Sequence, residues 1–118
     1  MSVITQPDLE AWVWQNLQTL RGVTCWEFTA IPTNPWQTEN GPWVYTHSIQ
    51  VDCRARRKVA AKQLAEQARQ TIVGLLGVPW SDGVITDATA TEGPFWLPDD
   101  DGAPRYVTRW EITTRPST

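Results

Sequence analysis

The chain has 118 residues, a formal net charge of −3 and a hydrophobic content of 41%. This length suits one domain, and the apolar content with a mean hydropathy of −0.39 excludes both a wholly disordered chain and a membrane protein. No apolar run approaches the ~20 residues of a bilayer span, and no basic region followed by an apolar block begins the chain, so no export signal is expected.

The cysteine, histidine and tryptophan content narrows the chemistry. Cys25, Cys53 and the single histidine, His47, lack the spacing of a zinc site, and two isolated cysteines favour reduced thiols over a disulfide. Tryptophan is abundant, with eight residues against two tyrosines and two phenylalanines. Because tryptophan is enriched at binding hot spots, these side chains are candidates for binding contacts.

Residues 6–21 are predicted to form an amphipathic helix. Thr5 is the expected N-cap, with Asp8 three residues later and Pro7 in the first turn. An apolar stripe at helical spacing defines the buried side: Leu9, Trp12, Val13, Leu17 and Leu20. Trp14 lies off that stripe, so it either covers the rim of the stripe or contacts another molecule.

Two strands joined by a long loop are expected next. Residues 23–31 alternate, with Trp26, Phe28 and Ala30 on one side. The loop at 32–42 is rich in proline and carries Trp36 at its centre, which favours a functional loop. Residues 43–53 are the clearest strand, with an apolar face of Trp43, Tyr45, His47, Ile49, Val51 and Cys53. A histidine on such a face is more often a hydrogen-bonded core residue than a catalyst.

Residues 56–76 are predicted to form a second, alanine-rich helix. Basic side chains crowd its start: Arg54, Arg56, Arg57 and Lys58. The macrodipole is positive at this end, where carboxylates would be expected. Residues 54–69 hold six Lys or Arg and one Glu, a local charge of +5, so the rest of the chain carries −8. The basic side chains either extend into water or contact an acidic protein surface or phosphate.

Two further strands are expected, one within residues 84–97 and one at 105–114. Between them, residues 98–104 form a turn with three aspartates, Asp99, Asp100 and Asp101. These suggest calcium, but Trp110 stands where an EF-hand loop starting at Asp99 would need its glutamate, so no metal site is expected.

The element order predicts a single α+β domain over residues 1–118. An antiparallel sheet of about four strands, with two helices packed on one face, satisfies the order α-β-β-α-β-β with short connections. The sequence contains no nucleotide-binding motif, no nucleophile elbow and no zinc-protease motif. His47 and Cys53 would lie about 20 Å apart along one strand, too far for a catalytic dyad. No catalytic residue, cofactor or enzymatic activity is therefore expected.

This layout resembles the tail terminator (tail completion) proteins of long-tailed bacteriophages. The resemblance is carried by the amphipathic first helix, by the strand running directly into the alanine-rich helix (THSIQVDCRARRKVAAKQLAEQARQTIVGLL), and by the acidic turn before RYVTRWEITTRP. It implies a ring of six copies that caps the head-proximal end of the tail tube, stops tube polymerisation and docks the head connector. The protein would belong to the virion tail or neck and be assembled in the host cytoplasm.

The resemblance also implies partners and sites. The partners would be further copies of the chain, the tail tube protein and the head–tail connector or head completion protein, without a membrane. Complementary charged blocks would allow head-to-tail contacts that close a ring, with interface candidates Trp14, Trp36, Trp80, Arg54, Arg56, Arg57 and Lys58. DNA would pass through the lumen without specific binding, because Asp99, Asp100 and Asp101 lining it would repel the phosphates.

Three alternatives stay open at this point. The chain could be another subunit of the head–tail neck or connector. It could be a small nucleic-acid-binding module that uses residues 54–69 with stacking tryptophans, although a pI near 5.0 counts against this. It could also be a ligand-binding or catalytic α+β domain with His47 in a pocket.

Overall fold

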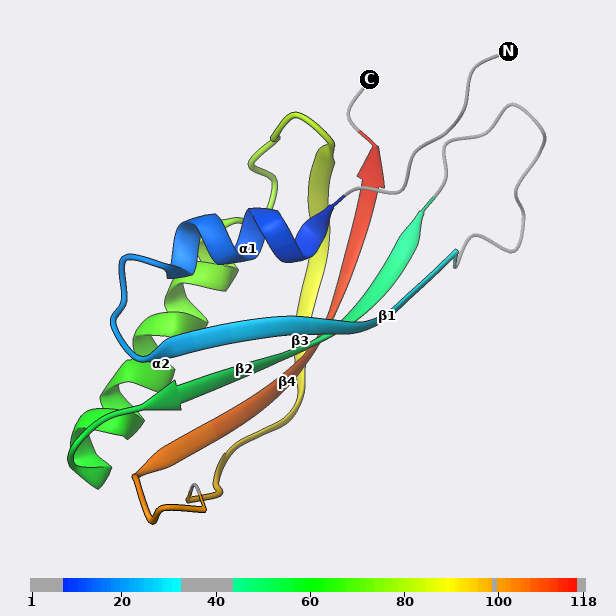
Figure 1. Cartoon of the computed structure of the whole chain (residues 1–118). Coiled ribbons are helices and arrows are strands. Elements are labelled where there is room, and N and C mark those ends of the chain that lie inside the picture. The colour runs from blue at the N-terminus through cyan, green and yellow to red at the C-terminus, as the bar shows by residue number, and fades with distance from the viewer. Residues whose placement is uncertain (1–7, 33–43, 99, 117–118) are drawn as a thin grey trace.

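The computed structural model describes residues 8–32, 44–98 and 100–116 of the chain. Two helices and four strands follow in the predicted order: α1 (Leu9–Leu17), β1 (Val23–Pro32), β2 (Tyr45–Arg54), α2 (Lys58–Gly74), β3 (Gly83–Trp96) and β4 (Arg105–Pro116). The strands form one antiparallel sheet in the spatial order β1-β2-β4-β3. The protein is therefore α+β, and Figure 1 shows both helices on the same side of the sheet.

The core lies between the helices and one face of the sheet. The two central strands contribute alternate residues to it, namely His47, Ile49, Val51 and Cys53 of β2 and Tyr106, Thr108, Trp110 and Ile112 of β4. α1 buries Leu9, Val13 and Leu17, and α2 buries Ala61, Ala65, Ala68 and Ile72. The buried side predicted for the first helix is confirmed at Leu9, Val13 and Leu17. In the predicted second helix Ala60 and Leu76, which were expected on the buried side, are exposed, and the buried alanines let the α2 backbone lie close to the sheet. In the part of the chain that the structure describes, no helix is both long and apolar enough to cross a membrane.

The start of α1 differs from the prediction. The helix begins at Leu9 rather than near residue 6, and its N-cap is Asp8, whose Oδ1 accepts the Ala11 N–H at 3.1 Å. An aspartate is a stronger N-cap than a threonine, which favours a helix start at Asp8. The proposed N-cap Thr5 and Pro7 lie outside the described residues.

The turn after α1 contains Gly22, which adopts a φ of 90°. A Cβ at this position would collide with the backbone of Arg54, so glycine is required here.

The alternation predicted for β1 is wrong in its second half. Glu27 pairs with Ile49 and Thr29 pairs with Ser48, so Phe28 is an extra residue, a β-bulge. An extra residue shifts the alternation, and Ala30 therefore pairs with the buried His47 while Trp26 pairs with Gln50 on the opposite face. Trp26 and Phe28 consequently lie on the face of the sheet that the helices do not cover, and the two rings contact each other edge to face.

Hydrogen-bonded polar side chains occupy part of the face of the sheet that the helices do not cover. Asp52 is only 1% exposed, and its carboxylate accepts hydrogen bonds from Gln50 Nε2 at 2.9 Å and from Arg105 Nη1 at 3.1 Å. Arg105 also donates to the carbonyl oxygen of Leu97. A buried charge with these partners is satisfied, so this patch of the sheet needs no covering helix.

Candidate functional site

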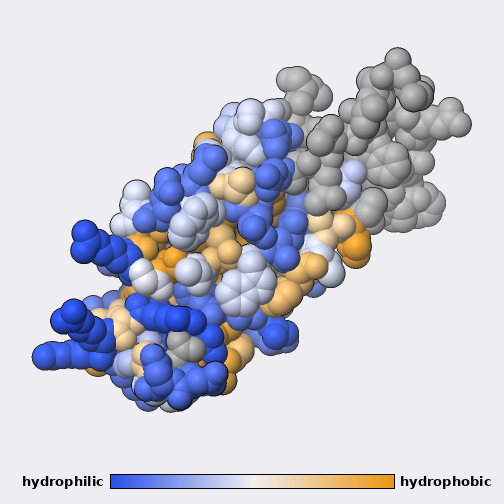
Figure 2. Space-filling model, viewed as in Figure 1, coloured by the Kyte–Doolittle hydropathy of each residue, from blue (hydrophilic) through white to orange (hydrophobic). Residues whose placement is uncertain are grey.

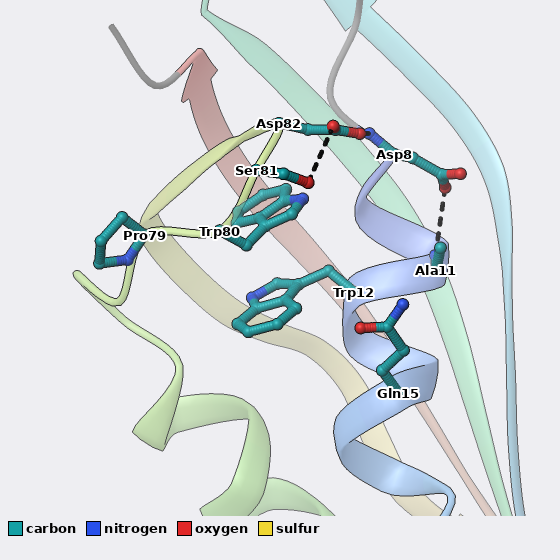
Figure 3. A pocket seen from close by; sticks show the side chains of 8 residues that line it. All are labelled: Asp8, Ala11, Trp12, Gln15, Pro79, Trp80, Ser81 and Asp82. Carbon is teal, nitrogen blue, oxygen red and sulfur yellow. Dashed lines mark hydrogen bonds between the residues drawn. The ribbon is translucent and has the colours of Figure 1, made fainter.

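A groove of about 400 Å³ lies between the first turn of α1 and the segment 79–82 that leads into β3. Its base is a pair of stacked indole rings, Trp12 of α1 and Trp80, with centroids 5.5 Å apart and planes 8° from parallel. Figure 3 shows Asp82 and Asp8 beside this stack and Gln15 further along α1. The stack exists because Trp12 belongs to the rim of the α1 stripe, and Trp80 packs on it from the other segment.

The Asp82 carboxylate joins the two segments of this groove. The Asp8 N–H donates to Asp82 Oδ2 at 3.1 Å, and Asp82 Oδ1 accepts from the Ser81 hydroxyl at 3.3 Å. Asp8 itself caps the helix. The Nε1 of Trp12 is buried and has no hydrogen-bond partner in the described part of the chain. The groove therefore combines aromatic faces with two exposed carboxylates.

A second groove of about 420 Å³ lies on the other side of the same helical turn. Its lining includes Glu10, Trp14, Thr24 and Cys25. Glu10 Oε2 accepts the Glu27 N–H of the edge strand β1 at 2.7 Å, which ties α1 to that strand. Burial raises the pKa of the Cys25 thiol from 9.0 to about 11, and the nearby Glu10 carboxylate adds to this effect. Cys25 is therefore a poor nucleophile at neutral pH.

The two grooves form what we call the acidic end of the molecule: Asp8, Glu10 and Asp82 with Trp12, Trp14 and Trp80. All three carboxylates are exposed. The ion pairs that the described residues form with arginine lie elsewhere, between Glu66 and Arg69, Asp52 and Arg105, and Glu92 and Arg109. The acidic end thus presents negative charge beside flat aromatic surfaces, which is the chemistry that receives a guanidinium or ammonium group.

The predicted basic residues form a second cluster, the basic end: Arg54, Arg56, Arg57 and Lys58. They lie where β2 leads into α2, and all four are exposed. Arg57 is the N-cap of α2 and makes no side-chain cap hydrogen bond, and the first turn has no acidic residue. Lys58 Nζ lies 4.8 Å from the centre of the Trp96 ring. Figure 2 shows strongly hydrophilic side chains projecting at the end of the molecule where α2 begins.

The acidic stretch of the sequence, residues 82–101, does not form one surface. β3 separates its two ends, and fourteen strand residues span on the order of 40 Å. Asp82 belongs to the acidic end, whereas Asp100 and Asp101 follow β3 and lie near the basic end, where the Ala55 N–H donates to Pro104 O at 3.2 Å. The described aspartates of this stretch therefore lie toward both ends of the molecule, because a long strand carries the chain across it.

The tryptophans predicted at an interface have different positions. Trp14 is 41% exposed in the second groove, and Trp80 is half-buried in the stack with Trp12. Trp36 and Asp99 lie outside the described residues. In the acidic turn, Asp101 Oδ1 accepts the Ala103 N–H at 2.9 Å, so this carboxylate stabilises the turn.

A buried polar network, which sequence patterns did not predict in full, crosses three strands. His47 Nδ1 contacts Glu27 Oε1, and His47 Nε2 contacts Thr114 Oγ1 at 2.7 Å. His47 and Thr114 are both 0% exposed, so solutes do not reach this His–Thr pair. The core role expected for His47 is confirmed. Its partners depend on the register of β1 and β4 against β2, which no local motif encodes.

The two cysteines lie on the same face of β1 and β2 but are not opposite each other. Cys25 pairs with Val51 and Cys53 with Val23, and both thiols are free. Such diagonal neighbours are about 7–8 Å apart, beyond the Cβ separation of a disulfide. Burial, together with Asp52, raises the pKa of the Cys53 thiol to about 12.

The site has no features of a metal centre within residues 8–32, 44–98 and 100–116, where no three His, Cys, Asp or Glu side chains converge. Neither the models of known protein families nor the curated proteins match this chain. Its two grooves and its charged ends must therefore be interpreted from their own chemistry.

Proposed function

We propose that this chain is a structural subunit that assembles into a ring, and that the ring caps the tail tube of a long-tailed bacteriophage. The order of elements that prompted the resemblance is the order of the structure. In this proposal the partners are further copies of the chain, the tail tube protein and the head–tail connector. Association rather than catalysis is the function.

The observation that carries the proposal is the apolar part of the uncovered sheet face. Trp26 is 36% exposed, Phe28 49% and Ile31 56%, all on the edge strand β1. Exposed aromatic side chains grouped in this way mark a surface that another protein covers. Arg109 lies 5.5 Å from the Phe28 ring, which adds a cationic group to the same surface.

Both edges of the sheet carry devices against direct strand pairing. β1 has its bulge at Phe28, and β3 has three register shifts and contains Pro94. Bulges and proline interrupt the row of free N–H and C=O groups that another strand would bind. Assembly in this proposal therefore uses side-chain surfaces and grooves, and not a continuous sheet.

Native mass spectrometry over a series of protein and salt concentrations tests the proposal. Six copies of the 13.4 kDa chain correspond to a ring of about 80 kDa. Polymerising a tail tube protein from the same phage, with and without the chain, distinguishes a terminator from another neck subunit, because only a terminator shortens the tubes. A chain that stays monomeric and leaves tube length unchanged would overturn the proposal.

A substitution on the uncovered face sharpens the test. Phe28→Ser removes an exposed ring without opening the core, so we expect a folded monomer that assembles poorly or no longer binds the tube. Val59→Ser is the matched control, because Val59 is 68% exposed on α2. If salt-dependent binding of DNA appeared in a gel shift and no ring formed, the nucleic-acid-binding alternative would replace this proposal.

A further inference from the structure

We infer that the subunits join head to tail, with Arg56 and Arg57 of one copy docked in the groove of Asp8, Trp12, Trp80 and Asp82 of the next. The occupant of the groove is thus a second copy of this chain. The inference rests on the proposed function, because it names the contact by which the ring would close.

The groove has the composition that binds arginine. A guanidinium stacks on an indole face and forms paired hydrogen bonds with a carboxylate. Trp80 lines the groove together with Asp82, which is exposed. The groove volume of about 400 Å³ lies within the range of roughly 300–1,000 Å³ found for ligand pockets. One or two long side chains are an appropriate occupant.

The basic end offers matching groups. Lys58 is directed to the Trp96 ring within its own chain, whereas Arg56 and Arg57 are exposed just before the first turn of α2. Arg57 occupies an N-cap position without capping it. A residue that is unfavourable for its own helix, placed at the surface, is consistent with a role in contacts with another molecule.

The two ends are separated by the length of α2. The helix has 17 residues and so spans about 25 Å, with the basic end at its start and the segment 79–82 beyond its end. Figure 1 shows the start of α2 and the turn after it at opposite ends of the helix layer. A contact between unlike ends is heterologous, and heterologous contacts generate rings when the rotation closes.

A charge exchange between the two ends tests the contact. Asp82→Lys places a cation against Arg57 of the next copy, and Arg57→Glu places a carboxylate against Asp82, so each variant alone should lose at least tenfold in association. An equimolar mixture should recover assembly, because every junction then joins opposite charges: Arg57 with Asp82, or the introduced glutamate with the introduced lysine. Glu66→Lys is the control, since this exposed glutamate lies on α2 between the two ends and should leave assembly intact.

Native mass spectra and sedimentation velocity at low and high salt provide the readout. Loss in both single variants with recovery in the mixture supports the contact, because a folding defect would not be repaired by mixing. If the wild type assembles and Asp82→Lys assembles equally well, or if mixing restores nothing, the contact is wrong while the proposed function stands. If the wild type neither assembles nor binds the tube, the proposed function fails and this contact fails with it.

Discussion

The two helices begin in opposite ways. α1 starts at Asp8, which caps the Ala11 N–H, and has Glu10 in its first turn. α2 starts at Arg57, which caps nothing, and is preceded and followed by further basic residues. Negative groups stabilise the positive end of the helix macrodipole, and positive groups oppose it. The first start is thus optimised for stability, and the second is not.

The unfavourable start of α2 is supported by the rest of that helix. α2 tolerates its basic start because its long alanine face packs on the sheet, and tertiary packing supplies most of the stability of a helix in a protein. α1 has only nine residues and depends more on its cap and on the Trp12–Trp80 stack. Basic residues therefore stand at the unfavourable end of the macrodipole in α2, the helix whose packing can compensate for the lost stability.

The largest effect is expected at the anchored start. Trp12→Ala removes the ring beneath Trp80 and should lower the free energy of unfolding by about 3 kcal/mol, the lower end for tryptophan truncation, since Trp12 is only partly buried. Urea unfolding followed by circular dichroism measures this. Trp14→Ala, at an exposed position of the same helix, should cost about 0.5 kcal/mol. Equal losses in the two variants would contradict the role given to the stack.

The cap of α1 should have the next largest effect. Asp8→Ala leaves the Ala11 N–H without its partner and should lower the free energy of unfolding by about 1 kcal/mol. Asp8→Asn keeps a capping oxygen and should lose far less. Thermal unfolding of the three proteins side by side gives the order, and an unaffected Asp8→Ala protein would show that this helix start is not held by its cap.

At the uncapped start of α2, a substitution should raise the free energy of unfolding. Arg57→Asp introduces a capping carboxylate at α2 and should raise the free energy of unfolding by about 0.5–1 kcal/mol. Arg56→Asp, one residue before the cap, should raise it less. The midpoints of urea unfolding of both variants and of the wild type measure these changes. A destabilised Arg57→Asp chain would mean that Arg57 stabilises the folded protein.

The smallest effect concerns the thiol beside α1. The Glu10 carboxylate contributes to the raised pKa of Cys25, after the larger effect of burial. Glu10→Gln removes this negative charge, so the pKa of Cys25 should fall from about 11 but stay above 9.0. The thiolate fraction at a given alkaline pH then rises. Iodoacetamide labelling of Cys25 against pH, followed by peptide mass spectrometry, should show the rate profile moved to lower pH, and an unmoved profile would remove Glu10 as a cause.

Sequence patterns predicted the elements well where a regular period ran without interruption. The alternating residues of β2 and the apolar stripe of α2 were enough to place both elements and their buried faces, because a period of 2 or 3.6 directly reports which side is covered. The bulge at Phe28 could not be predicted, since it depends on the partner strand and not on the residues of β1 alone.

The candidate site was predicted only in part. Trp14, Trp80 and the basic residues stood out by their type and by the rule they break. Asp8 and Asp82 did not, because they are 74 positions apart in the sequence and meet only once the sheet brings the turn before β3 to the start of α1. Glu27 and Thr114 were not predicted for the same reason, since their contact with His47 depends on the register of three strands.

The bulge in β1 has a consequence for how this surface can change. Phe28 is the one residue between Glu27 and Thr29 that has no partner in β2, and the pairs on both sides of it are in order. Its side chain lies against Trp26 and Arg109 on the uncovered face and does not enter the core. Substitution at this position can therefore change the exposed surface while the buried half of the strand keeps its register, so this surface and the fold are free to evolve separately.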